Sequence, residues 1–271
     1  HNDIKHDGEY LIIDGKKIAA ELKQTLAAEV GRRSKPPVLY AIVVGSDPVT
    51  EKFLFVKRKF AVDIGVSLQE IHFPENVLER EVLTRLSELA RERNAGVIVQ
   101  LPLPKQLNTE WILNAIPSQQ DVDVLTDLGA RAFAEGTSAV TPPVVGALKE
   151  ILTRENISLS GTGKHAVVVG QGRIVGIPAA LWLKREGCSV AIADEHTPDI
   201  ATLTKEADLI VLGAGHPHLI MPNMIKKGVI LLDAGTSEQG GKSTGDADPA
   251  CASKAALFTP TPGGIGPITV A

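Results

Sequence analysis

A strand-like run leads directly into a glycine-rich turn in the second half of the chain. The run His165–Val169 is followed by Gly170-Gln171-Gly172-Arg173, and a further glycine stands at Gly176. Glycines permit a tight turn and a close approach of backbone N–H groups to a pyrophosphate, and the start of a following helix attracts anions. The spacing G-x-G-x-x-x-G is one residue longer than the usual dinucleotide fingerprint, so a purely structural turn is the alternative.

Two carboxylates follow the next strand-like run, at a position that suits the same chemistry. Asp194 and Glu195 come directly after Ser189–Ala193, and Asp194 stands 24 positions after Gly170. In dinucleotide-binding folds an acid at this place accepts hydrogen bonds from the adenosine ribose. The pattern therefore predicts a dinucleotide site at Gly170, Gln171, Gly172, Arg173, Asp194 and Glu195.

The first half carries three polar features, each near the end of an expected strand. Lys57 stands four residues after Phe53, on the same face of a helix-like stretch. Gln100 ends a strand-like run, and Asp121 and Asp123 follow a short helical stretch. In open α/β sheets the ligand lies beyond the carboxyl ends of the strands, which favours a site. Taken singly, a surface lysine, a strand-end glutamine and an acidic turn are the alternatives.

Two kinds of pattern alternate along the chain and would position these groups. Apolar runs typical of parallel strands covered on both faces are Leu39–Val44, Gly96–Leu101, His165–Val169, Ser189–Ala193, Leu209–Leu212 and Val229–Leu232. Amphipathic helical stretches are Gly15–Val30, Leu78–Arg93, Thr109–Ala115 and Pro143–Arg154. This alternation predicts an α/β fold of two domains with a boundary near residues 135–165. We assign residues 10–140 to a catalytic domain and 141–271 to a Rossmann-type dinucleotide-binding domain.

The bulk composition is that of an ordinary globular protein, with 44% hydrophobic and 22% charged residues. A formal net charge of −4 and the lack of a basic stripe argue against nucleic-acid binding. No apolar run is long enough to span a bilayer, and the polar segment His1–Glu9 reads as a loose tail rather than a secretory signal. Two distant cysteines, Cys188 and Cys251, make neither a disulfide framework nor a metal site. We therefore expect a cytoplasmic protein without metal or membrane.

Several segments, taken in order, resemble the bifunctional methylenetetrahydrofolate dehydrogenase/cyclohydrolase family. The resemblance runs from Gly15 to the end of the chain, and its last piece, together with the Gln-Leu-Pro-Leu-Pro piece, is highly specific. The matching pieces are Val44-Gly45-Ser46-Asp47-Pro48, Lys57-Arg58-Lys59, Val99–Pro104, Asp121-Val122-Asp123, Thr141-Pro142, Ile174–Pro178, Gly245-Asp246-Ala247-Asp248 and Thr259–Pro267.

The resemblance implies two α/β domains with folate in a cleft between them, a crossing segment from the end of the chain, and a homodimer. It implies oxidation of 5,10-methylenetetrahydrofolate with NAD(P)⁺ and hydrolysis of the methenyl product to 10-formyltetrahydrofolate. The family's essential lysine maps to Lys57, its folate-cleft glutamine to Gln100 and its pterin-binding aspartate to Asp123. A carboxylate can pair with pterin N–H donors, and a lysine can polarise an oxygen or relay a proton. Further implied contacts are Phe53, Pro262, Gly263 and Gly264 for the folate and Thr236 for the dinucleotide.

The chain departs from the family pattern at several positions. Phe53 stands where the family usually has Tyr, and Val124 stands where it has Gly. The family commonly shows Gly-Arg-Ser where this chain has Gly170-Gln171-Gly172, and Ile-Asn-Arg where this chain has Thr236-Ser237-Glu238. Two alternatives follow: a dehydrogenase with an impaired cyclohydrolase, and a catalytically silent paralogue that binds folate or nucleotide.

The same departures bear on the cofactor. The Arg and Ser that hold the 2′-phosphate of NADP in the family are replaced by Gln171 and Gly172. Asp194 and Glu195 accept bonds from ribose hydroxyls but repel a phosphate, which favours NAD over NADP. Arg173 and His196 favour the opposite preference, because either side chain could reach a phosphate.

Overall fold

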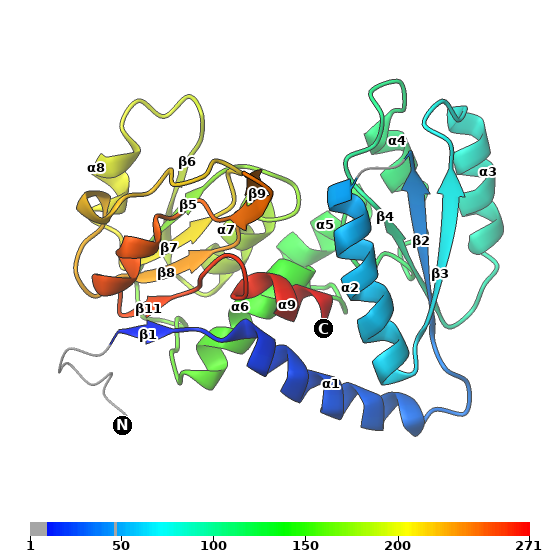
Figure 1. Cartoon of the computed structure of the whole chain (residues 1–271), viewed down its shortest axis with the longest axis horizontal. Helices are drawn as coiled ribbons and strands as arrows, with labels where there is room; N and C mark the ends of the chain where they lie inside the picture. The colour runs from blue at the N-terminus through cyan, green and yellow to red at the C-terminus, as the bar shows by residue number, and fades with distance from the viewer. Residues whose placement is uncertain (1–9, 46–47) are drawn as a thin grey trace. The chain divides into compact units, whose positions relative to one another are not determined.

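The computed structural model describes residues 10–45 and 48–271, which fold into two compact units. One unit combines residues up to Ala19 with Pro143–Thr269, and the other combines Ala20–Pro142 with Val270–Ala271. Both are α/β, so the expected fold class is confirmed (Figure 1). The expected tail His1–Glu9 and the turn residues Ser46-Asp47 lie outside the described residues. No helix in the described part of the chain is long and apolar enough to cross a membrane.

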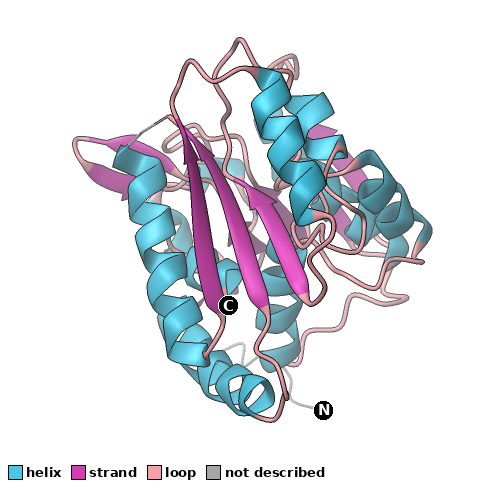
Figure 2. Ribbon diagram, turned by 90° about the vertical axis from the view of Figure 1, so that its right-hand side faces the viewer, coloured by secondary structure: helices cyan, strands magenta, loops and turns pink. Residues whose placement is uncertain are grey.

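The 20–142 unit is built on a parallel sheet of three strands in the order β3-β2-β4. The strands are β2 (Val38–Val44), β3 (Ser67–Phe73) and β4 (Ala95–Val99). Alternate residues of β2 enter two different cores: Tyr40 and Ile42 pack with α3 and α4, whereas Ala41 and Val43 pack with Leu54 of α2. Burial on both faces explains why β2 and β4 are continuous apolar runs. Figure 2 shows the three strands side by side with helices on either side.

Two of the helices of this unit have side-chain caps where they begin. The helices are α1 (Gly15–Gly31), which starts in the other unit, α2 (Pro48–Ile64), α3 (Glu79–Leu89), α4 (Thr109–Asn114) and α5 (Asp127–Glu135). Asn108 caps α4 by accepting the Trp111 N–H at 3.0 Å. Thr126 caps α5 by accepting the Gly129 N–H at 2.9 Å, and Gly136 ends that helix at φ +77°. Such caps satisfy N–H and C=O groups that a helix leaves open at its ends.

The other unit holds a six-stranded parallel sheet in the order β1-β11-β8-β7-β5-β6. Its strands are β1 (Leu11–Ile12), β5 (His165–Val169), β6 (Ser189–Ala193), β7 (Leu209–Leu212), β8 (Ile230–Asp233) and β11 (Leu257–Phe258). β6 lies on one side of β5 and β7 on the other, so the strand order reverses at β5. Dinucleotides bind outside the carboxyl ends of the strands at such a reversal.

Short connections and helices cover this sheet. They are α6 (Pro143–Arg154), α7 (Gly176–Arg185), α8 (Ile200–Thr204), α9 (Ile265–Val270), the 3-10 turns η1 (Pro222–Met224) and η2 (Pro249–Ser253), and the hairpin β9 (Ser237–Gln239) and β10 (Lys242–Thr244). One face of the sheet buries Val167, Val169, Ile210, Leu212 and Phe258 in a single apolar cluster. α7 contacts β5, β6 and β7 directly.

The first strand was not expected at its observed place. β1 pairs in parallel with β11, so residues 10–19 belong to the unit that contains the six-stranded sheet. β1 is only two residues long and exposed, and the apolar run that contains it, Tyr10–Ile13, is too short to indicate a strand by itself. The assignment of residues 10–140 and 141–271 to two functional domains stays a prediction.

Candidate active site and dinucleotide site

Lys57 and Phe53 lie one turn apart on α2, as their spacing predicts. Leu54, between them in sequence, is fully buried and anchors the helix on the sheet. Lys57 is partly buried, and Phe53 keeps 41% of its surface exposed. α2 therefore carries an amine and an exposed aromatic ring on one face, one turn apart.

The three adjacent cations of α2 have different surroundings. Arg58 pairs with Glu70 of β3, with its Nη2 2.7 Å from Oε1, and His72 contacts the other oxygen of Glu70 at 2.9 Å. Lys59 is exposed, whereas Lys57 is partly buried and its charge lowers the pKa of Asp123. The basic cluster is therefore more than a uniform solvated face, because the charge of one member acts on a predicted site residue.

The two carboxylates of Asp121-Val122-Asp123 differ in their hydrogen bonds. Asp121 is 4% exposed and accepts the N–H groups of Leu125 at 3.0 Å and Thr126 at 2.9 Å, so its carboxylate builds the turn. Burial raises the pKa of the Asp123 carboxyl, Lys57 opposes that shift and Asp121 adds to it. Among the residues that the structure describes, none donates a hydrogen bond to the Asp123 carboxylate. Of the two carboxylates, Asp123 is the one that the turn's backbone N–H groups do not use, and its contact with a ligand stays a prediction.

Gln100 directly follows β4, the strand that also contacts the Asp121 segment. Its backbone N–H donates to Ile42 O at 2.9 Å, and a parallel bridge joins Val97 of β4 to Asp121. The Gln100 amide donates weakly to Leu101 O at 3.5 Å, and its buried Oε1 has no partner among the described residues. A buried acceptor without a donor is costly, which points to a ligand N–H.

Val124 adopts a backbone conformation that branched residues avoid. Its φ is +57°, in the left-handed region, where a side chain costs roughly 1 to 2 kcal/mol. The Asp121 bonds to the next two residues hold the chain in this turn. The position is where the family resemblance shows Gly, a residue without that cost.

The glycine turn after β5 has two glycines that the fold requires. Gly170 has φ +100°, and a Cβ there would stand 2.5 Å from Gly213 O. A Cβ at Gly176 would stand 2.0 Å from Gly170 O. At Gly172, in contrast, a Cβ would meet nothing closer than 4.0 Å. Packing within the described chain therefore does not require a glycine at Gly172, and its contact with a dinucleotide stays a prediction.

Gln171 and Asp194 meet across the carboxyl ends of β5 and β6. The Gln171 Nε2 donates to Asp194 Oδ2 at 2.6 Å. Asp194 Oδ1 accepts the His196 N–H at 2.9 Å and the Thr197 hydroxyl at 3.3 Å. These bonds, the His196 N–H first, lower the pKa of Asp194, so the carboxylate stays ionised at neutral pH. Two residues far apart in sequence thus form one polar group where the ribose is expected.

The remaining predicted cofactor residues surround this group or lie on the next loops. Glu195 and His196 are highly exposed at the tip of the turn, with His196 Nε2 3.7 Å from Glu195 Oε1. Arg173 and Thr236 are also exposed, on the glycine turn and after β8. Their contacts with a dinucleotide stay predictions.

The segment Pro262-Gly263-Gly264 packs against the start of α1. Gly15 N donates to Gly263 O at 2.9 Å, and a Cβ at Gly15 would overlap Gly264 O. A Cβ at Gly264 would stand 2.6 Å from Pro260 O. These contacts give the glycines a structural reason within the chain, while their predicted approach to a ligand remains a prediction.

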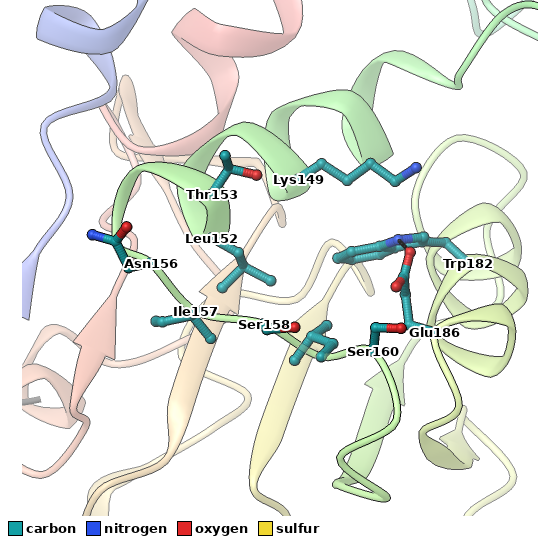
Figure 3. A pocket seen from close by; sticks show the side chains of 10 residues that line it. Lys149, Leu152, Thr153, Asn156, Ile157, Ser158, Ser160, Trp182 and Glu186 are labelled. Carbon is teal, nitrogen blue, oxygen red and sulfur yellow. Dashed lines mark hydrogen bonds between the residues drawn. The ribbon is translucent and has the colours of Figure 1, made fainter. Parts of the chain in front are cut away.

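A cavity of about 520 Å³ lies elsewhere in the same unit, at the C-terminal ends of α6 and α7 (Figure 3). Trp182 Nε1 donates to Glu186 Oε1 at 2.9 Å on one side of it. Its lining is Lys149, Leu152, Thr153, Asn156, Ile157, Ser158, Leu159, Ser160, Trp182 and Glu186. None of the predicted site residues lines this cavity.

Two buried carboxylates have no assigned role in the sequence analysis. Asp233, at the end of β8, and Asp246 are 1% and 0% exposed. Burial raises the pKa of Asp233 to about 7, and the negative charge of Asp246 adds to the rise. For Asp246, the sequence signal was the Gly245-Asp246-Ala247-Asp248 segment. Small residues on both sides of an acid fit a closely packed, buried position.

Family models match two consecutive parts of the chain: the tetrahydrofolate dehydrogenase/cyclohydrolase catalytic domain at residues 13–123 and its NAD(P)-binding domain at residues 119–271. Bifunctional protein FolD of Clostridium tetani is 37% identical over 265 residues, covering 95% of this chain and 94% of that protein. Bifunctional protein FolD 2 of Lactobacillus johnsonii is 35% identical over 265 residues, covering 96% of this chain and 93% of that protein.

Solved structures give the same result. The bifunctional FolD enzyme of Campylobacter jejuni superposes with a TM-score of 0.92 at 31% identity, covering 97% of this chain and 95% of that one. The Trypanosoma brucei enzyme, solved with NADP cofactor and inhibitor, gives 0.91 at 30% identity, covering 97% and 94%. With both domain models matched in order along nearly the whole length, this chain belongs to the tetrahydrofolate dehydrogenase/cyclohydrolase family.

Proposed function

We propose that this chain oxidises 5,10-methylenetetrahydrofolate to the methenyl form with NAD(P)⁺ and hydrolyses that product to 10-formyltetrahydrofolate. The observation that carries the proposal is the pair formed by Lys57 and Asp123, an amine whose charge acts on a buried carboxylate. Gln100, directly after β4, adds a buried amide oxygen without a donor among the described residues. Family membership supplies the chemistry for which this group is suited.

Asp123 and Gln100 bind the pterin. The carboxylate of Asp123 accepts hydrogen bonds from the pterin amino group and ring N–H, and the Gln100 Oε1 accepts another ligand N–H. Both acceptors lie at least partly buried and lack donors among the described residues, so a bound pterin removes an unfavourable state. The charge of Lys57 keeps the Asp123 carboxylate nearer to its ionised form.

In the oxidation, a hydride leaves the methylene carbon together with its bonding pair, and the remaining N–C–N group carries the positive charge of the methenyl product. Bound NAD(P)⁺ supplies the hydride acceptor. The chain fits this group: Gly170 and Gly176 shape the turn, Gly172 leaves the backbone accessible, and α7 begins beside it. Gln171, Arg173, Asp194, Glu195 and Thr236 complete the proposed dinucleotide site.

In the hydrolysis, water adds to the methenyl carbon, loses a proton, and the bond from that carbon to N5 breaks as N5 takes up a proton. Net, one water is consumed and one proton is released. Lys57 donates a hydrogen bond to the attacking oxygen and relays the proton. Its place one turn after Phe53 on a helix anchored by buried Leu54 holds the amine in position.

We further propose that the enzyme prefers NAD⁺ to NADP⁺. Asp194 is ionised and held by Gln171, and Glu195 is exposed beside it. Two carboxylates at the ribose repel a 2′-phosphate, while the Gln171 amide supplies no compensating charge. Arg173 and His196 are the side chains that oppose this preference.

We also propose that the enzyme is a homodimer and that it is located in the cytoplasm. β6 ends the six-stranded sheet, and its Ile192 is 39% exposed, an edge able to pair with a second copy. Cys188 and Cys251 are buried thiols, which suits a reducing compartment. Light scattering after size-exclusion chromatography measures the assembly, and a monomer at working concentration contradicts it.

The function is tested by one coupled spectroscopic assay. Methenyltetrahydrofolate absorbance is followed after mixing enzyme, methylenetetrahydrofolate and each cofactor, and its decay is then followed against the spontaneous rate. We expect formation and accelerated decay. Formation without accelerated decay supports the alternative of a dehydrogenase without cyclohydrolase activity. The feature of the chain that favours this alternative is Phe53 in place of Tyr. No formation with either cofactor refutes the proposed function.

A further inference from the structure

The loop after β7, residues 213–216, is packed against the glycine turn. Gly213 N donates to Val169 O at 2.9 Å, and Gly213 O occupies the place that a Cβ at Gly170 would need. A Cβ at Gly213 would stand 2.4 Å from Val175 Cγ1. At Gly213 the loop and the turn therefore have no room for a methyl group between them, so the loop after β7 borders the glycine turn.

A single buried carboxylate clamps this loop. Asp246 Oδ2 accepts the N–H groups of Ala214 at 2.7 Å and Gly215 at 3.1 Å, and Oδ1 accepts that of His216 at 2.8 Å. Three successive N–H groups thus converge on one anion, the arrangement that elsewhere forms an anion-binding concavity. Because Asp246 fills it, these N–H groups are used within the chain and set the loop's path.

Asp233 supports the clamp from the end of β8. Its Oδ2 accepts the N–H of Ala247, the residue after Asp246, at 2.9 Å, and its Oδ1 accepts that of Gly235 at 2.9 Å. A Cβ at Gly235 would stand 2.2 Å from Asp246 Cγ, and one at Gly245 would stand 2.2 Å from Asp233 Oδ2. Gly235 leaves space for the Asp246 carboxylate, and Gly245 leaves space for the Asp233 carboxylate. The two acids are therefore packed together.

The hairpin after β8 holds the same loop from another side. The Ser237 hydroxyl donates to Gly215 O at 2.7 Å. Ser237 is partly buried, and β9 begins with it. The loop is therefore fixed at its N–H groups by Asp246 and at one carbonyl by Ser237.

The strand order says which part of a dinucleotide this loop serves. β5 and β6 form the half that takes the adenosine, with Asp194 after β6. β7 and β8 lie on the other side of the reversal and form the half for the second nucleotide. The loop after β7 thus borders the nicotinamide half.

We propose that Asp246 is a positioning residue for the nicotinamide half of the dinucleotide, acting through residues 214–216 with Asp233 as its support. The inference rests on the proposed dehydrogenase function. It gives the Gly245-Asp246-Ala247-Asp248 segment a task in that reaction. The adenosine half, held by the glycine turn and Asp194, and the hydrolytic group around Lys57 do not depend on the clamp.

The test compares Asp246→Asn with the wild type. An amide keeps one acceptor oxygen and turns an NH₂ toward a backbone N–H. We expect the dissociation constant for NADH, measured by its fluorescence, to rise at least tenfold. The dissociation constant for ADP, which probes the adenosine half, is expected to change less than twofold. Methenyl hydrolysis is expected to stay within twofold, which a loss of folding would not allow.

The matched control is Asp208→Asn, a carboxylate at the other end of β7 that accepts the His165 N–H at 2.9 Å. It is expected to leave NADH binding unchanged. Equal losses for ADP and NADH, or no loss for NADH, overturn the inference. If Asp246→Asn does not fold, Ser237→Ala decides: a smaller rise for NADH alone supports the clamp, and no change refutes it.

The outcomes separate this inference from the function on which it rests. A wild type that forms no methenyltetrahydrofolate with either cofactor refutes the function. A wild type that is active, with unchanged NADH binding in Asp246→Asn and Ser237→Ala, refutes only the positioning role.

Discussion

Adjacent side chains on one helix have very different environments in this protein, and the differences decide which of them is suited to chemistry. Arg58 is paired with Glu70 on β3, Lys59 is exposed, and Lys57 lies partly buried in the field of Asp123. A guanidinium already held in an ion pair has little capacity left for a substrate. Lys57 is the member of the run whose charge acts on a predicted ligand-binding group.

Lys57→Met should lower methenyl hydrolysis at least about 100-fold, the usual scale for a lost general acid–base group. The change keeps the length of the side chain and removes the amine, so the melting temperature should stay close to that of the wild type. Lys59→Met, two positions on and exposed, is the control and should retain the wild-type rate. Wild-type hydrolysis by Lys57→Met above the spontaneous background removes Lys57 from the mechanism.

Phe53→Tyr adds a hydroxyl one turn before Lys57 on the same face. We expect faster methenyl hydrolysis, because the hydroxyl can hydrogen-bond the amine, and little change in the oxidation. Phe55→Tyr is the control, since Phe55 is also exposed but is not one turn from Lys57. An equal or lower rate in Phe53→Tyr means that this chain supports its lysine in another way.

Asp123→Ala should weaken binding of a folate analogue far more than binding of NADH. A lost charge-assisted hydrogen bond costs about 1.5 to 3 kcal/mol, roughly a ten- to hundred-fold rise in the dissociation constant. Titration calorimetry measures both ligands, with Asp127→Ala, an exposed acid on α5, as control. Unchanged folate-analogue affinity would rule out the pterin-binding role.

At the scale of elements, the loops that follow β5 and β6 determine the proposed preference for NAD⁺ over NADP⁺. The glycine turn brings Gln171 to Asp194 only because β5 and β6 are parallel neighbours whose carboxyl ends coincide. The turn at residues 194–197 then fixes the carboxylate through the His196 N–H and the Thr197 hydroxyl. The preference is thus a property of two loops rather than of one residue.

Asp194→Ser/Glu195→Ser should shift kcat/KM toward NADP⁺, because two negative charges beside the 2′-phosphate are removed. The wild type should show the higher kcat/KM with NAD⁺. The pKa of Asp194 is lowered, so this preference should persist across neutral pH and fade only in acid. A wild type that prefers NADP⁺ tenfold or more contradicts the proposal and makes Arg173 the candidate for the phosphate.

At the scale of the whole molecule, the pair Asp233 and Asp246 links stability to pH. The pKa of Asp233 is about 7 in the folded protein and 3.8 without the fold. A raised folded pKa means that the stabilising contribution is present below pH 3.8 and is lost as the pH rises through 7. The unit that contains the six-stranded sheet should therefore be less stable at pH 8.5 than at pH 5.5.

Asp233→Asn imitates the protonated acid and should flatten that dependence. The measurement is the difference in melting temperature between pH 5.5 and 8.5, compared between the variant and the wild type so that histidine titration cancels. Asp208→Asn is the control, because the pKa of Asp208 is lowered by Lys226 and its contribution is lost only in acid. An Asp233→Asn variant with the wild-type loss of stability between the two pH values contradicts the linkage.

Elements with a clear hydrophobic pattern could be predicted from the sequence, while short or alternating edge elements could not. β5, β6, β7 and α6 have the predicted bounds, and β2, β4 and β8 differ by one or two residues. Burial leaves continuous apolar runs in β5 and β7, whereas β6 is an edge strand that is apolar although partly exposed. β3 was missed because its residues alternate between exposed and partly buried at the edge of its sheet. The hairpin β9–β10 is short and largely exposed, so its residues carry no burial signal.

The sequence by itself determined the fold class, the family and the residues that carry the proposed chemistry, since each depends on local periodicity or on short motifs. The tertiary structure alone decided which of them meet. Lys57 and Asp123 are 66 positions apart, Gln171 and Asp194 are 23 apart, and Asp246 reaches N–H groups about 30 positions back. It also distinguished Asp121, whose carboxylate accepts N–H groups of its own turn, from Asp123, whose carboxylate does not. Such contacts arise from parallel register and crossover connections, which bring strand ends together regardless of their distance along the chain.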